Sequence, residues 1–201
     1  MATRRDIMLG GSAVLVLGGL RLGYGRDEAV AATPVRPCTS GTVTRRQTEG
    51  PYFKSNTPQR RNIREPNVRN GLLIVTGQVL DTQCRPIAGA VIDFWQTGDD
   101  GDYDNRGYKY RGHQLTDAQG RYELLTIRPV QYSAMGIFRT PHIHAKLQGA
   151  GTGTLNTQLY LPDAEATNKI DRIFDASLLT RLEGTKDGAQ LAAFDFVLAR
   201  G

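Results

Sequence analysis

Six short apolar runs separated by turn residues constrain the fold of this chain more than any other feature. Each run is rich in Val, Ile, Leu, Phe, Tyr or Thr, and several alternate apolar and polar residues at a period of two. They cover residues 72–80, 90–96, 121–127, 142–147, 155–161 and 194–198, with turn signals such as Asp99-Asp100-Gly101 and Asp117-Ala118-Gln119-Gly120 between them. Because no helical crossover separates the runs, the pattern predicts an all-β fold, an antiparallel β-sandwich.

The 201 residues divide into three parts by composition. Residues 71–201 carry the apolar runs and form the predicted sandwich, with at most one short helix, expected at 175–182. Residues 32–70 are polar, contain turn dipeptides such as Thr57-Pro58 and Glu65-Pro66, and are predicted to form an irregular arm. Residues 1–31 have the character of a targeting segment.

This first part combines a basic start, an apolar stretch and a small-residue cleavage site. The Arg4-Arg5 pair precedes an apolar stretch at 7–20, and Ala29-Val30-Ala31 follows. The stretch is too short and too rich in glycine to span a membrane, which takes about 20 apolar residues. We expect a twin-arginine-type signal cleaved after Ala31, which would export the domain to the periplasm or the cell exterior with no stable membrane insertion. An uncleaved N-terminal anchor is the alternative.

Export would place the two cysteines in an oxidising compartment. Cys38 and Cys84 could then pair and tie the arm to the sandwich, and two unpaired thiols are the alternative. On the loop-entropy argument such a bridge contributes about 3–4 kcal/mol to stability.

The charge of the chain is mildly basic and spread along its length. Lys and Arg number 25 against 20 Asp and Glu, a formal net charge of +5, and no stretch interleaves basic and aromatic residues. We therefore expect no nucleic-acid partner, and only a mild attraction for anionic small molecules. A homo-oligomer is compatible with the sequence.

Two of the three histidines lie two residues apart in a predicted strand. His142 and His144 therefore project from one face of that strand, while Ile143 faces the other way. Neutral imidazoles are ligands for Zn, Cu, Fe and Ni, so the pair alone leaves the metal open. No carboxylate is well placed to complete a 2-His-1-carboxylate site, whereas Tyr103 and Tyr132 lie in flanking segments.

A series of motifs runs in a fixed order between residues 48 and 163. They are Thr48-Glu49-Gly50-Pro51-Tyr52-Phe53, residues 77–90, Trp95-Gln96 with Gly101-Asp102-Tyr103, Thr116-Asp117-x-x-Gly120-x-Tyr122, Thr126-Ile127-x-Pro129-x-x-Tyr132, Arg139-x-Pro141-His142-Ile143-His144 and Thr157-Gln158-Leu159-Tyr160. Together they resemble the intradiol ring-cleavage dioxygenases, which include the catechol and protocatechuate 3,4-cleaving enzymes. Without the N-terminal helical dimerisation domain of the catechol-type enzymes, the chain resembles the small, exported, single-domain branch.

The resemblance implies a non-haem Fe(III) enzyme that inserts both atoms of O₂ into a catechol-like substrate. The ring would open between its two hydroxylated carbons to a muconate-type diacid. By position in the motifs, the resemblance assigns the iron ligands to Tyr103, Tyr132, His142 and His144. It assigns catalytic roles to Arg139, Gln158 and Tyr132, the last as a ligand that also accepts a substrate proton. Val130-Gln131 stands where the family usually has a glycine before the second tyrosine.

Two other interpretations remain open at this point. A non-catalytic, transthyretin-like binding module of the cell envelope would explain the strands and turns, but not the two tyrosines together with the histidine pair. A Zn or Cu hydrolase built on His142 and His144 would leave the tyrosines without a role.

Overall fold

The computed structural model describes residues 38, 41–68, 71–134 and 136–201. The expected export signal at 1–31 lies outside the described residues. Eleven strands and three short helical turns make up the regular structure of the described part. The strands are β1 Leu72–Asp81, β2 Val91–Trp95, β3 Arg111–Leu115, β4 Arg121–Ile127, β5 Tyr132–Ala134, β6 Ile137–Arg139, β7 His142–Gln148, β8 Leu155–Tyr160, β9 Arg181–Lys186, β10 Ala189–Ala193 and β11 Phe196–Leu198.

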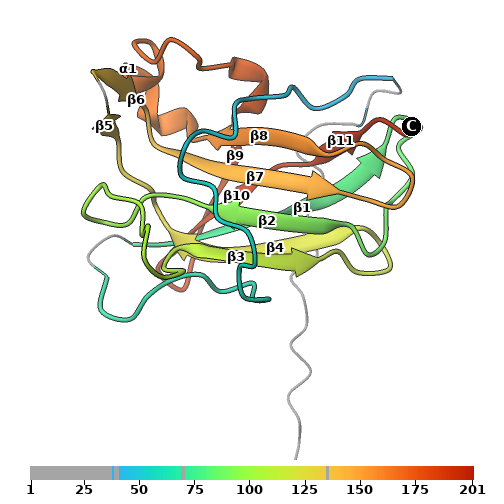
Figure 1. Ribbon diagram of the computed structural model, residues 1–201, viewed down its shortest axis with the longest axis horizontal. Helices are drawn as coiled ribbons and strands as arrows, with labels where there is room; N and C mark the ends of the chain where they lie inside the picture. The colour runs from blue at the N-terminus through green and yellow to red at the C-terminus, as the bar shows by residue number, and fades with distance from the viewer. Residues whose placement is uncertain (1–37, 39–40, 69–70, 135) are drawn as a thin grey trace, which may run out of the picture.

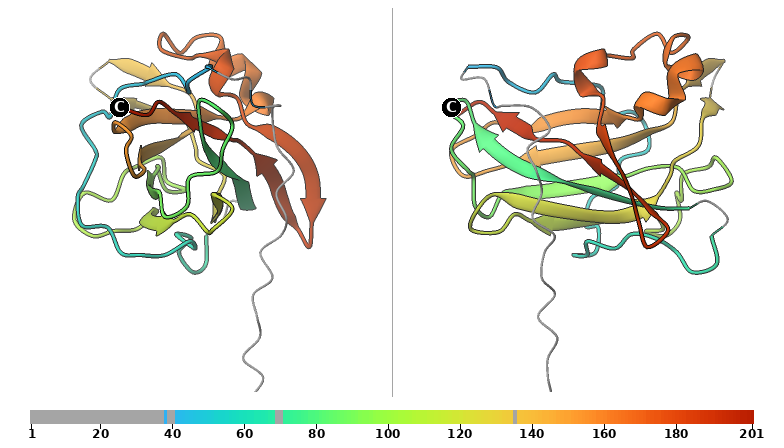
Figure 2. Two further views of the ribbon diagram at one scale, coloured as in Figure 1. Left: turned by 90° about the vertical axis from the view of Figure 1, so that its right-hand side faces the viewer. Right: turned by 180° about the vertical axis from the view of Figure 1, so that it is seen from behind.

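Two sheets pack face to face and confirm the predicted β-sandwich (Figures 1 and 2). One sheet has the order β3-β2-β7-β8, and the other has the order β11-β1-β10-β9 with β4 on β1. The core between them is apolar and draws on both sheets, for example Leu73 and Val75 from β1, Phe94 from β2 and Ile143 from β7. A separate hairpin, β5-β6, lies at one end of the sandwich.

The pairing is mixed, which corrects the expectation of a purely antiparallel sandwich. β1 runs parallel to both β10 and β11, while its pairing with β4 is antiparallel. The chain passes from β10 to β11 close against β1, where a Cβ on Gly77 would fall 1.8 Å from the carbonyl oxygen of Phe194. Only glycine allows two backbones to approach this closely.

The prediction of a helix at 175–182 is wrong. Asp175 caps a single 3-10 turn, Ala176–Leu178, by accepting a hydrogen bond from Ser177 N at 2.8 Å, and β9 begins at Arg181. Leu178 is fully buried, and Thr180 N donates to Tyr160 O at 2.9 Å, so contacts with β8 hold this segment. The one α-helix of the described residues is a single turn, α1 Glu165–Asn168, after the 3-10 turn Pro162–Ala164. None of the helices in the described residues is long and apolar enough to cross a membrane.

The segment 41–68 contains no helix or strand and runs along the outer face of the β3-β2-β7-β8 sheet (Figure 1). Gln47 N donates to Asn156 O in β8 at 2.8 Å, and Thr157 Oγ1 donates to Arg45 O at 2.7 Å. Of the two alternatives left open for the cysteines, the structure has the Cys38–Cys84 disulfide, with 5.6 Å between the two Cα atoms. The arm is therefore anchored at its start and covers the face of the sheet that points away from the core.

Candidate metal centre

The strand period places the histidine pair on the outer face of the sheet, under the arm. Ile143 and Ala145 of β7 point into the core, so His142 and His144 point the other way. Both imidazoles are almost completely buried, with exposed fractions of 2% and 1%. Gly50 of the arm supplies part of the cover, since a Cβ there would lie 3.6 Å from Cε1 of His144. The prediction that the pair shares one face is confirmed.

Two tyrosines reach the same point from other parts of the chain. Tyr103 comes from the loop after β2, and Tyr132 begins β5. Tyr103 Oη lies 3.3 Å from Nε2 of His142, and this nitrogen lies 3.2 Å from Nε2 of His144. The Tyr132 ring packs edge-on against Tyr103, with 5.4 Å between ring centroids, and lies 5.7 Å from the ring centroid of His142. We call these four side chains, Tyr103, Tyr132, His142 and His144, the Tyr–His cluster.

The hydrogen bonds of the histidines leave ligand atoms facing the centre of the cluster. Nδ1 of His142 lies 2.6 Å from the carbonyl oxygen of Thr140, so Nδ1 carries the proton and Nε2 presents its lone pair. Burial, with Arg139 nearby, lowers the pKa of His142 to about 3. Burial and the neighbouring His142 hold the pKa of His144 well below its usual value. Both imidazoles are therefore neutral at physiological pH, the form that binds metals.

The two hydroxyls are held in their neutral form unless a cation is present. Burial raises the pKa of Tyr103 well above its usual value, and the neighbouring Tyr132 raises it further. Burial also raises the pKa of Tyr132. Phenol oxygens in such surroundings ionise when a strongly acidic metal ion supplies the compensating charge.

The separations among Tyr103, His142 and His144 fit a shared ion. Two ligand atoms that each lie about 2.1 Å from one metal are roughly 3.0–3.4 Å apart, which matches the 3.2 Å and 3.3 Å contacts. Nδ1 of His144 is buried without a hydrogen-bond partner, so no hydrogen bond fixes the orientation of this ring. Instead, its ring stacks on Trp95 of β2, with 4.6 Å between centroids and 6° between planes. Among the described residues, no group of three His, Cys, Asp or Glu side chains is placed to hold a metal, which leaves tyrosine as the additional donor.

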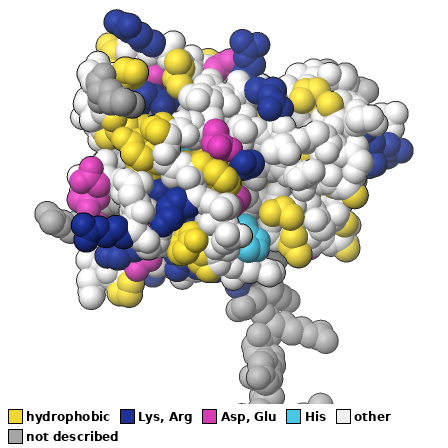
Figure 3. Space-filling model, viewed as in Figure 1, with side chains coloured by type: hydrophobic (Ala, Val, Ile, Leu, Met, Phe, Trp, Pro, Cys, Tyr) yellow, Lys and Arg dark blue, Asp and Glu magenta, His cyan; other side chains and the backbone are white. Residues whose placement is uncertain are grey.

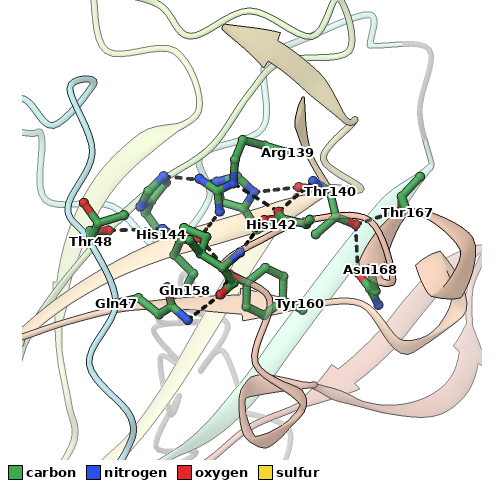
Figure 4. Close-up of polar contacts among 12 residues, drawn as sticks. Gln47, Thr48, Arg139, Thr140, His142, His144, Gln158, Tyr160, Thr167 and Asn168 are labelled. Atoms are coloured by element: carbon green, nitrogen blue, oxygen red, sulfur yellow. Dashed lines mark hydrogen bonds and ion pairs between the residues drawn. The ribbon is translucent and has the colours of Figure 1, made fainter. Parts of the chain in front are cut away.

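Arg139, at the end of β6, is buried beside the cluster with 7% exposure. Its Nε donates to Asp171 Oδ2 at 3.0 Å, and its Nη2 donates to Gln158 Oε1. It also pairs with Tyr132 across the β5-β6 hairpin. Figure 4 shows Arg139 and Gln158 turned toward the histidine pair.

Gln158 lies beside His144, and its amide is engaged with the protein. Its Oε1 accepts from Arg139 and from Tyr160 Oη, and its Nε2 donates to Thr48 O at 3.1 Å. In the register of β8 and β7 it lies directly beside His144. Its contacts therefore fix the guanidinium and the arm relative to the cluster.

A second arginine, Arg111 of β3, holds the loop that carries Tyr103. It is fully buried, its Nη1 donates to Tyr52 O at 2.6 Å and its Nε donates to Asp104 O at 3.0 Å. Its guanidinium carbon lies 5.8 Å from the centroid of the Tyr103 ring. On the other side of Tyr103, the Tyr52 ring stacks at 4.4 Å and 14°.

Val130-Gln131, the departure from the family pattern, does not displace Tyr132 from the cluster. Val130 O accepts a hydrogen bond from Thr97 Oγ1 at 3.1 Å, which joins this loop to the segment after β2. The side chain of Val130 also lies 3.5 Å from the position of a Cβ on Gly101. The loop is packed against the segment that carries Tyr103.

A cavity of about 250 Å³ opens beside the cluster. Tyr132, Arg139 and His144 line it, and the rest of its wall comes from Thr48, Gly50, Pro51, Tyr52, Ala134, Ile137, Asp171, Arg172 and Ile173. Tyr103, His142 and Gln158 do not line it. A small molecule in this cavity would contact one tyrosine and one histidine of the cluster directly.

No signal in the sequence indicates that Asp171, Arg172 and Trp95 belong to the site. Asp171 follows Arg139 by 32 residues in an irregular segment, so no period or motif connects them. Trp95 reaches His144 only because β2 and β7 are neighbours in register. Tyr52 was within a recognisable motif, yet its stacking on Tyr103 depends on the path of the arm.

Comparisons with known proteins agree with this geometry. A family model described as "Dioxygenase" matches residues 48–200. The chain is 30% identical over 173 residues to a chlorocatechol 1,2-dioxygenase of Pseudomonas sp. (strain P51), covering 76% of this chain and 69% of that protein. It is 29% identical over 202 residues to the protocatechuate 3,4-dioxygenase beta chain of Burkholderia cepacia, covering 85% of this chain and 86% of that protein. Among solved structures, the chain is similar to the dioxygenase domain of a dioxygenase and carbohydrate-binding fusion protein from Streptomyces sp. SirexAA-E. The sequence identity is 39% and the TM-score is 0.73, and the match covers 80% of this chain and 100% of that one.

Proposed function

The chain belongs to the intradiol ring-cleavage dioxygenase family, and from this premise we propose that it opens catechol-type rings with a ferric ion held by the Tyr–His cluster. The observation that carries the proposal is the convergence of the Tyr103 oxygen and two neutral imidazole nitrogens on one buried point, with the Tyr132 ring packed against Tyr103 and His142 at the wall of a cavity. Neither a binding module nor a hydrolase built on the histidines alone would require these two tyrosines.

When bound, a ferric ion supplies a Lewis acid that takes both catechol oxygens and makes the ring open to attack by O₂. Two phenolate ligands suit such an ion because they neutralise most of its charge. A phenol has an ordinary pKa near 10, and burial raises it further here, so the tyrosines match a trivalent ion better than a divalent one.

The two tyrosines have different roles because only one reaches the cavity. Tyr132 lines the cavity, so its oxygen is placed to accept a proton from a catechol hydroxyl. Tyr103 does not line the cavity and is buried between Tyr52 and Arg111, so it would serve only to hold the ion. His142 is kept in one tautomer by Thr140 O and stays neutral.

Arg139 stabilises negative charge that develops on the substrate. It lines the cavity with a guanidinium whose orientation is fixed by Asp171 and Gln158. A preorganised cation in a buried site stabilises an anionic transition state without reorganising during the reaction. Gln158 acts through Arg139 and is therefore a positioning residue.

Oxygen uptake with matched diols tests the activity. The iron-loaded protein should consume O₂ with catechol, a 1,2-diol, but not with resorcinol or hydroquinone, whose hydroxyls cannot both bind one ion. With ¹⁸O₂, both labelled atoms should appear in a muconate-type diacid. A ring-opened aldehyde, or a product with no label, would contradict cleavage between the hydroxylated carbons.

We also propose that the enzyme works outside the cytoplasm. The Cys38–Cys84 disulfide supports this, because such bonds persist in oxidising compartments. Cell fractionation of the full chain should find the protein in the exported fraction. Replacing the Arg4-Arg5 pair by two lysines should retain it in the cytoplasm, and unchanged export would refute a twin-arginine route.

A further inference from the structure

We infer that the outer part of the cavity is a subsite for an anionic side arm on the catechol ring, and that Arg172 recognises this anion. The inference rests on the proposed function and specifies its substrate class. It depends on three features of the cavity wall: spare volume, an uncompensated positive charge and apolar flanks.

The cavity is larger than a bare aromatic ring requires. A cavity of about 150 Å³ is enough to hold benzene. The cavity beside the Tyr–His cluster measures about 250 Å³, so a catechol ring seated against the cluster leaves space further out. A substituent on the ring is therefore accommodated without moving the protein.

The charges that line this cavity do not cancel. Asp171 is neutralised by Arg139, and its two carboxylate oxygens also accept from the backbone N–H groups of Thr140 and Ile173, both at 3.0 Å. Arg172 is exposed and has no hydrogen-bond or ion-pair partner among the described residues. The lining residues include no second carboxylate, so the cavity wall carries one free positive charge.

Apolar side chains flank this cation. Ile137 and Ile173 are both unusually exposed for large hydrophobic residues, at 54% and 38%, and both line the cavity. A ring substituent that combines a short apolar spacer with a terminal carboxylate would contact the isoleucines along its length and Arg172 at its end. A guanidinium binds a carboxylate through two parallel hydrogen bonds, which makes this pairing specific as well as favourable.

The face of the molecule in Figure 3 shows basic side chains scattered among apolar and acidic ones, with no continuous basic stripe. A local cation in the cavity, rather than the overall charge of +5, would therefore decide the preference. The cavity should favour catechols with a carboxylate arm over neutral ones, and should disfavour catechols with an amine arm.

Pairs of substrates that differ only in charge test this inference. We would measure kcat/KM for 3,4-dihydroxybenzoate, 3,4-dihydroxyphenylacetate and 3-(3,4-dihydroxyphenyl)propionate, each beside its methyl ester. At least one acid should exceed its ester by about fivefold, the range of a single charge-assisted contact at a partly exposed site. Raising the ionic strength should reduce the advantage of the acid and leave the ester unchanged.

Variants of the arginine assign the effect to one side chain. Arg172→Gln should remove the advantage of the acid and change kcat/KM for the ester less than twofold. Arg172→Lys should retain part of the advantage of the acid. Arg64→Gln is the matched control, since it removes the same charge from an exposed position on the arm that does not line the cavity. Binding of 3-(3-hydroxyphenyl)propionate, which has no second hydroxyl and is not cleaved, should weaken in Arg172→Gln alone.

The outcomes separate the two proposals. If neither acids nor esters support O₂ uptake, the proposed function fails. If esters and acids are cleaved equally well, or if Arg172→Gln affects both alike, the ring-cleavage activity stands and the anionic subsite is refuted.

Discussion

Arg139 and Asp171 form a buried ion pair, in which Nε of the arginine lies 3.0 Å from Oδ2 of the aspartate. The two side chains are exposed by only 9% and 1%. The same carboxylate accepts a hydrogen bond from Thr140 N, and Thr140 O in turn orients His142. One aspartate outside every recognised motif therefore supports both the cavity arginine and a proposed metal ligand.

Removing this aspartate should destabilise the protein strongly. Asp171→Ala leaves the Arg139 charge buried without its partner, which typically costs about 3–5 kcal/mol. Urea unfolding measures the loss. Glu165→Ala is the control, because the Glu165–Lys169 pair is exposed to solvent and its loss should have a far smaller effect on stability. Equal losses of stability in the two variants would show that the buried ion pair contributes no more than the exposed one.

Gln158 should affect catalysis only through Arg139. Gln158→Ala should lower kcat about tenfold, leave iron content unchanged and have little effect on KM. In a double mutant with Arg139→Ala, the loss should be no larger than that of Arg139→Ala alone, because the two side chains act as a unit. Additive losses would assign Gln158 an independent contact with the substrate.

The Tyr–His cluster should be visible in the absorption spectrum of the iron-loaded protein. Charge transfer from phenolate to ferric iron is expected to give a burgundy colour with a broad visible band. Tyr103→Phe and His142→Ala should each bleach or strongly weaken this band and lower the iron content. Tyr108→Phe is the matched control, since the Tyr108 hydroxyl bonds to Ser55 O away from the cluster. An unchanged band in both ligand variants would refute the assignment.

The disulfide between the arm and the turn after β1 should contribute substantially to stability. The bridge closes a separation of 46 residues, for which loop entropy predicts about 4 kcal/mol. The exported protein should gain two daltons on reduction, and a Cys38→Ser/Cys84→Ser variant should unfold at lower urea concentration. A reduced protein as stable as the oxidised one would contradict the prediction.

Asp81 should make stability depend on pH in the acid range. Burial alone would raise the pKa of Asp81, but hydrogen bonds from Arg85, Arg200 and the backbone N–H of Gln83 outweigh it and lower the pKa. A carboxyl whose pKa is lower in the folded state stabilises the protein above its unfolded pKa of about 4, and this contribution is lost as the pH falls. The stability difference between wild type and Asp81→Asn should therefore be constant near neutral pH and shrink below about pH 4. A difference independent of pH would contradict the ion-pair explanation.

Most of the individual strands were predictable because burial on one face imposes a period of two. Residues 121–127 show this pattern, and β4 has these bounds; His142 and His144 share a face for the same reason. Five strands were missed: β3, β5, β6, β9 and β10. Of these, β3 and β9 carry polar or exposed residues, for example Gln114 and Glu183, and show no such alternation. β5 and β6 are only three residues long, too short for a period of two to stand out. The helix expected at 175–182 failed because long-range contacts with β8, rather than local propensity, hold that segment.

The sequence by itself determined the six strands with strong apolar runs, which face their side chains take, and the order of motifs that marks the family. These properties follow from the local geometry of the backbone and from short-range spacing. Only the tertiary structure decided that β10 and β11 run parallel to β1, that Asp171 holds Arg139, and that Arg172 faces the same cavity as Tyr132. Those contacts join segments whose separation along the chain carries no periodic signal, so they exist only once the sheets have packed and the arm has closed over them.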